Sequence, residues 1–364
     1  MKFLIKKEIL LEKLQKITGP TSFKQNFPIL SGVLISTQNN KLKFITTDLD
    51  ITIISLQEAK IEEEGKMVIS MKRLLSIVRE LPSCELTLQS SKNNLLIKCE
   101  KIEFKISILD AKEFPPVEEK TRTSLIKLNP QDLEEMINLT SFCVGEEDVN
   151  YVLNGVLFEV FKDKISLVST DGKRLSCVTK NLPSTQSDIE EKVSFILPLK
   201  AINELSRLIK NEEEVFLFTE QNKVGFDFKH TQFIIRPIEG EFPNYSQYIP
   251  QEGENRLKIK KRDFLFALRR ANLLSTPDYQ GVKLELKKNH LFISKITPEI
   301  GEAKEIVDAT YEGPSLEIGF NPAYLIDVLK NLEDEEVSFE FFGQDKPAVL
   351  RKENYIYLVL PMKI

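Results

Sequence analysis

The feature that most constrains the fold is an internal repeat, because the chain presents the same succession of patterns three times. A glycine that opens an alternating apolar run marks the same point in each copy, at Gly32, Gly155 and Gly281, with spacings of 123 and 126 residues. The tripeptide Glu-Phe-Pro closes the first two copies, and its phenylalanines, Phe114 and Phe242, lie 128 residues apart. Such self-similarity indicates one supersecondary unit that has been copied, so the fold must contain three similar units.

Each copy predicts two amphipathic helices. Apolar residues at helical spacing, among them Leu10, Leu14 and Ile17, predict a helix near the start of every copy. These first helices are expected at 5–18, 128–144 and 259–274. The second helices are expected at 71–81, 198–209 and 322–332. Proline stands near the start of two of the second helices, where its missing N–H removes no hydrogen bond that the helix needs.

The segments between the helices predict strands. Residues 156–160 and 165–168 alternate with a period of two, which indicates strands with one buried face, and Lys162-Asp163 between them fits a hairpin turn. Each copy is therefore an α+β unit with helices on one face of an antiparallel sheet. Because a chain of 364 residues exceeds one hydrophobic core, we expect domains at 1–120, 121–250 and 251–364.

Composition bounds the class of protein. No stretch approaches about 18 consecutive apolar residues and no apolar signal region follows the start, so we expect a cytoplasmic protein without a membrane span. The net charge of −5 argues against a protein that coats nucleic acid with its whole surface but leaves room for a local basic face. The cysteines are scattered without a Cys-x-x-Cys pair, and we expect buried free thiols at Cys84, Cys99, Cys143 and Cys177.

Signs of catalysis are sparse. The two histidines, His230 and His290, lack a neighbouring metal-ligand pattern, and no phosphate-binding loop, G-x-S-x-G or H-E-x-x-H motif occurs. Asp48 and Asp50 alternate with apolar residues, which fits the exposed face of a strand more simply than a metal site. We therefore expect no catalytic residues, no metal and no cofactor, with an unrecognised enzyme as the distant alternative.

Segments in all three copies resemble the β subunit of bacterial DNA polymerase III, the β sliding clamp. The resemblance covers the whole chain and is carried by 27–33 (FPILSGV), 47–51 (TDLDI), 153–158 (LNGVLF), 170–175 (TDGKRL), 317–321 (EIGFN) and 360–364 (LPMKI). It implies a non-enzymatic homodimer of three DNA-clamp domains per chain, which closes head to tail into a six-domain ring with helices lining a hole for duplex DNA. A clamp-like paralogue that serves repair or resistance to an inhibitor is the alternative.

Basic residues concentrate on the predicted helices, and they are either phosphate contacts without sequence preference or solvated helix faces. They are Lys6, Lys7, Lys13, Lys16, Arg79, Arg207, Lys210, Lys260, Lys261, Arg262, Arg269 and Arg270. By resemblance, the contacts with double-stranded DNA fall at or beside Lys24, Lys72, Arg73, Lys200, Tyr279, Gln280 and Lys283. The acidic start of the second copy, at Asp132, Glu134 and Glu135, departs from this pattern.

The resemblance also implies a surface groove for short partner peptides with a Gln and then Leu or Phe anchors. The partners would be the catalytic subunit of DNA polymerase III, the clamp loader and other proteins with a clamp-binding motif. The groove residues would be Leu153, Thr170, Gly172, Lys173, Arg174, Leu175, Pro243, Gln247, Tyr248, Ala348, Val359, Leu360, Pro361 and Met362. Read without the resemblance, these residues form a hairpin turn and a buried last strand.

The same resemblance places the dimer interface between the third domain of one chain and the first domain of the other. It would pair edge strands and pack Leu273 and Leu274 against Phe104. Leu273 and Leu274 end a predicted helix beside the polar Ser275-Thr276-Pro277, so the pair is exposed unless a partner covers it or the helix end folds back on its own core.

Overall fold

The computed structural model describes residues 1–21, 27–38, 40–117, 126–145, 151–182, 192–220 and 222–363. Within these residues the α-helices are α1 (Lys7–Lys16), α2 (Met71–Glu80), α3 (Pro130–Thr140), α4 (Leu199–Ile209), α5 (Lys261–Asn272) and α6 (Pro322–Asn331). Short 3₁₀ turns are η1 (Pro28–Ser31), η2 (Ser141–Cys143), η3 (Tyr151–Leu153) and η4 (Tyr245–Tyr248). No helix in the described part of the chain is both long and apolar enough to cross a membrane.

The described strands form antiparallel sheets of three sizes. A five-stranded sheet has the order β5-β1-β7-β8-β9, made of Lys60–Glu63, Lys2–Lys6, Glu85–Ser90, Asn94–Cys99 and Ile102–Ser107. An eight-stranded sheet has the order β10-β15-β16-β17-β4-β3-β2-β6, made of Ile126–Leu128, Val215–Glu220, Lys223–Phe228, Thr231–Ile235, Ile51–Glu58, Lys41–Thr47, Gly32–Gln38 and Lys66–Ser70.

A twelve-stranded sheet joins the middle and last repeats. Its order is β14-β11-β12-β13-β25-β24-β23-β18-β21-β20-β19-β22, made of Val193–Pro198, Gly155–Val160, Lys164–Thr170, Arg174–Asn181, Tyr355–Val359, Ala348–Lys352, Glu336–Phe341, Arg256–Lys260, Gly301–Glu312, His290–Thr297, Val282–Lys287 and Leu316–Phe320. Strands from different repeats therefore pair within one sheet, which joins the repeats by main-chain hydrogen bonds.

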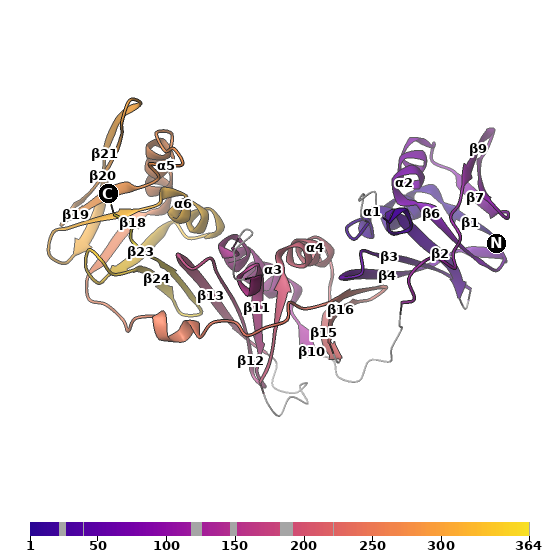
Figure 1. Ribbon diagram of the computed structural model, residues 1–364, viewed down its shortest axis with the longest axis horizontal. Coiled ribbons are helices and arrows are strands. Elements are labelled where there is room, and N and C mark those ends of the chain that lie inside the picture. Colours follow the sequence, from indigo (N-terminus) through magenta and orange to yellow (C-terminus); the bar gives the residue numbers. More distant parts are fainter. Residues whose placement is uncertain are drawn as a thin grey trace. The chain divides into compact units, whose positions relative to one another are not determined.

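The chain folds as two compact units. Of the described residues, the first unit holds those within 1–130 and 203–237, and the second holds those within 131–182, 192–202 and 238–363. The five- and eight-stranded sheets belong to the first unit and the twelve-stranded sheet to the second. In each unit a pair of helices packs side by side, α1 with α2 and α5 with α6 (Figure 1). The division passes through the middle repeat, because that repeat shares one sheet with each neighbour.

The helices begin later than their apolar spacing predicts, because a strand leads directly into them. Phe3 and Ile5 alternate with exposed or half-buried residues and pair with β7, and Leu257 and Ile259 do the same with β23. The expectation that Ile5 and Ile259 start helices is wrong. One or two apolar residues fit either period, and pairing with a strand distant in sequence decides between them.

Three side-chain hydrogen bonds repeat with the copies. Thr46 Oγ1 donates to the carbonyl of Ile17 at 2.7 Å, Ser169 Oγ donates to that of Thr140 at 2.5 Å, and Thr297 Oγ1 donates to that of Leu274 at 2.6 Å. In each case a hydroxyl near the end of a strand satisfies a carbonyl at the end of the first helix of the repeat, where no intrahelical donor remains. The copies thus share side-chain contacts as well as their outline.

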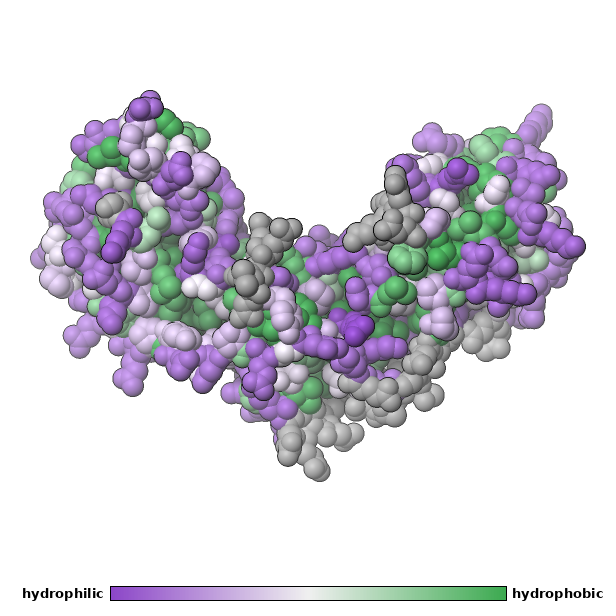
Figure 2. Space-filling model, viewed as in Figure 1, coloured by the Kyte–Doolittle hydropathy of each residue, from purple (hydrophilic) through white to green (hydrophobic). Residues whose placement is uncertain are grey.

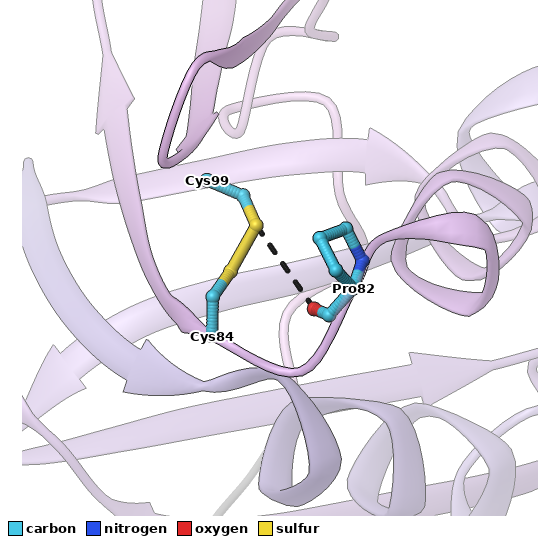
Figure 3. The surroundings of a disulfide bond; sticks show 3 residues. All are labelled: Pro82, Cys84 and Cys99. Atoms are coloured by element: carbon cyan, nitrogen blue, oxygen red, sulfur yellow. Dashed lines mark hydrogen bonds between the residues drawn. A yellow bond between two sulfur atoms is a disulfide. The ribbon is translucent and has the colours of Figure 1, made fainter.

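One expectation about the cysteines is wrong. Cys84 and Cys99 form a disulfide, with their Cα atoms 6.3 Å apart (Figure 3). Cys143 and Cys177 are free. Cys84 immediately precedes β7 and Cys99 ends β8, so the β7–β8 hairpin brings the two sulfurs together beside the carbonyl oxygen of Pro82. A spacing of 15 residues carries no such signal, because the hairpin register decides which residues meet.

Candidate nucleic-acid and partner-binding surfaces

Two strand pairs link successive repeats, and we call them the first and second joints. At the first joint, in the first unit, β17 pairs with β4 so that Ile235 lies opposite Ile51. At the second joint, in the second unit, β25 pairs with β13 so that Val359 lies opposite Arg174. The backbone continues in the same way at both, since Arg236 N donates to the carbonyl of Asp50 at 2.8 Å and Leu360 N donates to that of Lys173 at 2.9 Å.

The turn that opens each joint is built identically. At the second joint Asp171 Oδ1 accepts from the backbone N–H groups of Lys173 and Arg174, and Thr170 Oγ1 accepts from that of Gly172. At the first joint Asp48 and Thr47 accept the equivalent three bonds. The central residue is left-handed in both turns, with φ 81° at Gly172 and φ 83° at Leu49. The turn therefore follows from its Thr-Asp pair, which holds the backbone by local side-chain bonds.

Arg174 points into the second joint instead of toward solvent, and only 9% of its surface is exposed. Its Nε donates to Asp171 at 3.0 Å, Nη1 donates to Asp327 at 2.7 Å and Nη2 donates to the carbonyl of Phe142 at 2.7 Å. The guanidinium also lies 4.5 Å from the centre of the Tyr324 ring. The Arg174 side chain thus contacts four partners. The sequence predicts Arg174 as a groove residue, but it does not predict this inward orientation.

Beneath the second joint lies an apolar cluster that includes Leu153, Leu175, Val349 and Leu358, all buried. Partly buried side chains packed against it come from Phe242, Tyr245, Ile249 and Phe342, among others. Of the predicted groove residues, Ala348 and Val359 are fully buried and support the surface from below. Those exposed are Gly172, Lys173, Pro243, Gln247, Tyr248, Leu360 and Met362, whereas Thr170 and Pro361 are half-buried. We call these exposed residues the junction surface.

The η4 turn, which carries Gln247 and Tyr248, is anchored by a buried carboxylate. Tyr245 Oη donates to Glu159 Oε2 at 2.6 Å, and Lys192 forms an ion pair with the same carboxylate. Burial and the Glu159 contact raise the pKa of Tyr245, and burial together with the Glu159 charge raises the pKa of Cys177 to about 12. Sequence reasoning missed Glu159, because a single Glu in an otherwise apolar strand gives no local sign of its partner.

A cavity of about 760 Å³ lies on the helix side of the second joint, between α3, β13, the end of α6 and the β24–β25 turn. Its charged lining residues are Glu135, Glu333, Asp334 and Glu353 against Lys180 and Lys352. Lys180 Nζ donates to Glu135 at 2.6 Å and Lys352 Nζ donates to Asp334 at 2.5 Å. The excess of carboxylates makes this cavity unfavourable for phosphate.

Comparison with known proteins decides the family. The N-terminal, central and C-terminal domain models of the DNA polymerase III beta subunit match residues 1–118, 127–244 and 246–363. A Beta sliding clamp of Pseudomonas putida is 33% identical over the full length of both chains, and one of Staphylococcus aureus is 30% identical over 99% of its length. The crystal structure of the DNA polymerase III subunit beta from Pseudomonas aeruginosa matches with a TM-score of 0.94 at 30% identity over both full chains.

The chain belongs to the DNA polymerase III beta subunit family. The α+β fold of three tandem clamp domains is thereby confirmed, and so is the resemblance noted from sequence. The function of this family of β sliding clamps is that of a processivity clamp in DNA replication. The family is non-catalytic, and no group of three or more His, Cys, Asp or Glu in the described residues is placed to hold a metal ion.

The β-clamp residues predicted to contact DNA are spread over both units. Lys72 and Arg73 are exposed on α2, Lys200 is exposed on α4, and Tyr279 is 49% exposed. Gln280 accepts a hydrogen bond from Asn321 Nδ2 at 3.2 Å, and Lys283 pairs with Glu317 at 3.3 Å. Lys24 lies outside the described residues. In the view of Figure 2, hydrophilic residues cover most of the surface and apolar residues lie in small groups.

Several basic helix residues are engaged in contacts within the chain. Lys13 Nζ donates to Ser55 Oγ at 3.1 Å and to the carbonyl of Leu56, and burial lowers the pKa of this lysine. Lys16 pairs with Glu212, and Arg270 pairs with Glu305. In the last repeat, Lys295 is 2% exposed. Its Nζ donates to the carbonyls of Tyr279 at 2.5 Å and Gly281 at 2.7 Å, and these bonds hold the loop that carries Tyr279 and Gln280.

Proposed function

We propose that this chain is a DNA sliding clamp that works as a closed ring: two copies join head to tail, encircle duplex DNA and tether the polymerase to it, without catalysing a reaction. We further propose that the domains span 1–120, 121–250 and 251–364 and that the ring acts in the cytoplasm. The observation that carries the proposal is a pair of open sheet edges, one in the first repeat and one in the last.

The first open edge is β9, one of the two edge strands of the five-stranded sheet, where Ile102 and Phe104 are 39% and 37% exposed. The second is the initial part of β21, because residues 301–308 pair with β20 on one side while β18 pairs only with 309–312 on the other. Ile306 is 60% exposed on this strand, and Leu273 at the end of α5 is 82% exposed. Open edges with exposed apolar residues favour association with another strand.

Pairing of β9 with β21 of a second copy covers both edges. Such a contact is heterologous, because it joins different surfaces of identical chains, and it closes into a ring when the same contact forms twice. It brings Phe104 of one copy to Leu273 and Leu274 of the other, the residues predicted to form the dimer interface. Leu274 is already half-buried within its own chain, so Leu273 and Phe104 gain most from the contact.

We propose that double-stranded DNA is held by the exposed basic side chains Lys72, Arg73 and Lys200 on helices. Tyr279 and Gln280 in the loop before β19, and Lys283 on β19, would add further contacts. Contacts with phosphate carry no sequence information, which a protein that travels along DNA requires. They also weaken as salt is added, because each one releases a condensed counterion. Enclosure by the ring, instead of tight binding, would then keep the clamp on its DNA.

Partner proteins dock at the junction surface. Tyr248, Leu360 and Met362 are 64%, 42% and 36% exposed beside the apolar cluster of the second joint. An extended peptide with a Gln and apolar anchors suits this surface, because apolar side chains supply area and the exposed Lys173 and Gln247 supply polar contacts at the margin. We propose that the polymerase III catalytic subunit, the clamp loader and other proteins with such a motif share this surface.

The ring is tested by its retention on DNA. Labelled protein is placed on nicked circular plasmid by its loader and ATP and then separated by gel filtration before and after the plasmid is cut. We expect the protein to remain with the circle and to leave once the DNA is linear. A Leu273→Asp/Phe104→Asp variant, which places charge on both sides of the seam, should stay folded, sediment as a monomer and fail to be retained. Equal retention on circular and linear DNA would refute the ring.

A further inference from the structure

Asp327 and Arg174 connect the junction surface to a helix of the last repeat. Arg174 belongs to the turn that carries Gly172 and Lys173, and Asp327 belongs to α6. The Nη1 of Arg174 donates to Asp327 Oδ2 at 2.7 Å, and the guanidinium stacks on Tyr324, one helical turn earlier. A second bond supports α6 from below, since Tyr357 Oη donates to the carbonyl of Tyr324 at 2.8 Å. Arg174 thus joins the turn to α6, and Tyr357 joins α6 to β25.

The position of the turn sets the position of the exposed apolar residue beside it. Leu360 N donates to the carbonyl of Lys173 at 2.9 Å, so the backbone of Leu360 follows that of the turn. Thr170 Oγ1 donates to the carbonyl of Arg174 at 2.6 Å and closes the turn on itself. A shift of Arg174 would then move Lys173 and Leu360 together.

The first joint shows that the same turn forms without a buried arginine. Ile51 occupies the place of Arg174 there, with 2% exposure, and the turn makes the same backbone contacts. The Arg174–Asp327 pair adds little net stability, because desolvation of the buried guanidinium offsets much of the attraction and the Asp327 side chain is 34% exposed, whereas the pair restricts the arrangement of the groups that it joins. At the second joint we therefore expect the ion pair to restrict the geometry of the turn more than it adds stability.

We infer that Asp327 is a positioning residue of the partner-binding surface: through Arg174 it holds the turn 170–174 and Leu360 in the arrangement that a partner peptide recognises. Asp327 itself lies on α6 and reaches the turn through its bond to Arg174. This inference rests on the proposed docking of peptides at the junction surface, and it adds a residue that sequence patterns leave unmarked.

The test compares peptide affinity among full-length variants. A fluorescent peptide with a Gln followed by Leu and Phe anchors is titrated with wild type, Asp327→Asn, Asp327→Glu and the control Asp334→Asn. Asp334 also carries an ion pair just beyond α6, to Lys352, but it makes no contact with the turn. We expect Asp327→Asn to weaken binding about fivefold or more, which is the low end of coupling between linked sites. Asp327→Glu should restore most of the affinity, and Asp334→Asn should bind as wild type does.

Unfolding midpoints separate positioning from general damage. Weaker binding by Asp327→Asn with an unchanged midpoint supports the inference, as does non-additivity with Arg174→Lys in a double-mutant cycle. Unchanged binding by Asp327→Asn, an equal loss in Asp334→Asn, or a loss that appears only with a lowered midpoint would overturn it. If wild type does not bind the peptide at all, the proposed docking function fails before the role of Asp327 is reached.

Discussion

The two joints between repeats use one backbone design with different side chains. At the first joint Ile51 and Ile235 face each other, both buried, and the chain continues into the exposed Arg236. At the second joint the equivalent residues are Arg174, Val359 and Leu360, so a buried charge and an exposed apolar residue replace a buried apolar residue and an exposed charge. Buried apolar side chains suit a joint that only links two repeats, whereas exposed apolar side chains suit the partner-peptide binding that we propose for the second joint.

The contacts that helices make near the two joints also differ. Near the first joint, Arg207 on α4 donates to the carbonyls of Gln15 and Lys16 at the end of α1, at 3.0 and 2.6 Å. At the second joint the space between α3 and α6 is instead a cavity of about 760 Å³, and Arg174 holds α6 from the sheet side. Near the first joint, hydrogen bonds therefore link two helices directly. At the second joint the link runs from the sheet through Arg174 to α6.

The largest expected effect is on the stability of the first joint. Ile51→Ala removes buried apolar volume, and such truncations cost about 2–5 kcal/mol because the cavity collapses only partly. Denaturant unfolding of the variant should show this loss, while peptide affinity at the second joint stays within about twofold of wild type. Ile51→Val is the graded control, with an expected cost of about 1 kcal/mol. A strong loss of peptide affinity in Ile51→Ala would contradict the division of roles between the joints.

A smaller effect is expected when the second joint is given the residue of the first. Leu360→Arg places a charge where a partner peptide requires apolar contact, and the lost contact of about 1.5–3 kcal/mol corresponds to a roughly tenfold or greater loss of affinity. Fluorescence anisotropy with the labelled peptide measures it. The matched exchange at the first joint, Arg236→Leu, should leave the affinity unchanged. If Leu360→Arg binds as wild type does, the junction surface is not the docking site.

The smallest effect is chemical. Cys177 lies opposite Ile356 in the second joint, and because burial raises its pKa to about 12 it remains a thiol at pH 8, whereas an unfolded cysteine titrates near 9. A thiol reagent at pH 8 should therefore label Cys177 slowly in the folded protein. Bound peptide should slow this labelling about twofold further, and labelling should accelerate as the pH rises toward 12. The comparison variant is Ile54→Cys at the equivalent place in the first joint, where bound peptide should have no effect.

The same labelling experiment reports on the disulfide. In urea without reductant, mass spectrometry should find two labelled cysteines, Cys143 and Cys177, because Cys84 and Cys99 are bonded. After reduction all four should be labelled. Four labels before reduction would show that the Cys84–Cys99 bond is absent in solution, and labelling of Cys177 at the same rate in folded and unfolded protein would show that the second joint opens freely.

Local patterns were sufficient for the repeat, the helices and the alternating strands, because the period of apolar residues depends on neighbours a few positions away. The resemblance to the β clamps, carried by short segments in all three copies, led to the family and to the list of groove residues. Neither the disulfide of Cys84 with Cys99 nor the strand character of Ile5 and Ile259 could be predicted, since both depend on pairing with distant strands.

The sequence by itself determined that this chain is three copies of one α+β unit, because each pattern is written within a short stretch. Only the tertiary structure decided what individual charged residues do there. Arg174 turns inward to Asp327, Lys13 bonds to Ser55 and Lys295 holds the loop at Tyr279. The partner of a charged side chain depends on which elements pack together across the sheet and not on position along the chain. Residues of one type therefore form buried contacts at one place and face solvent at another.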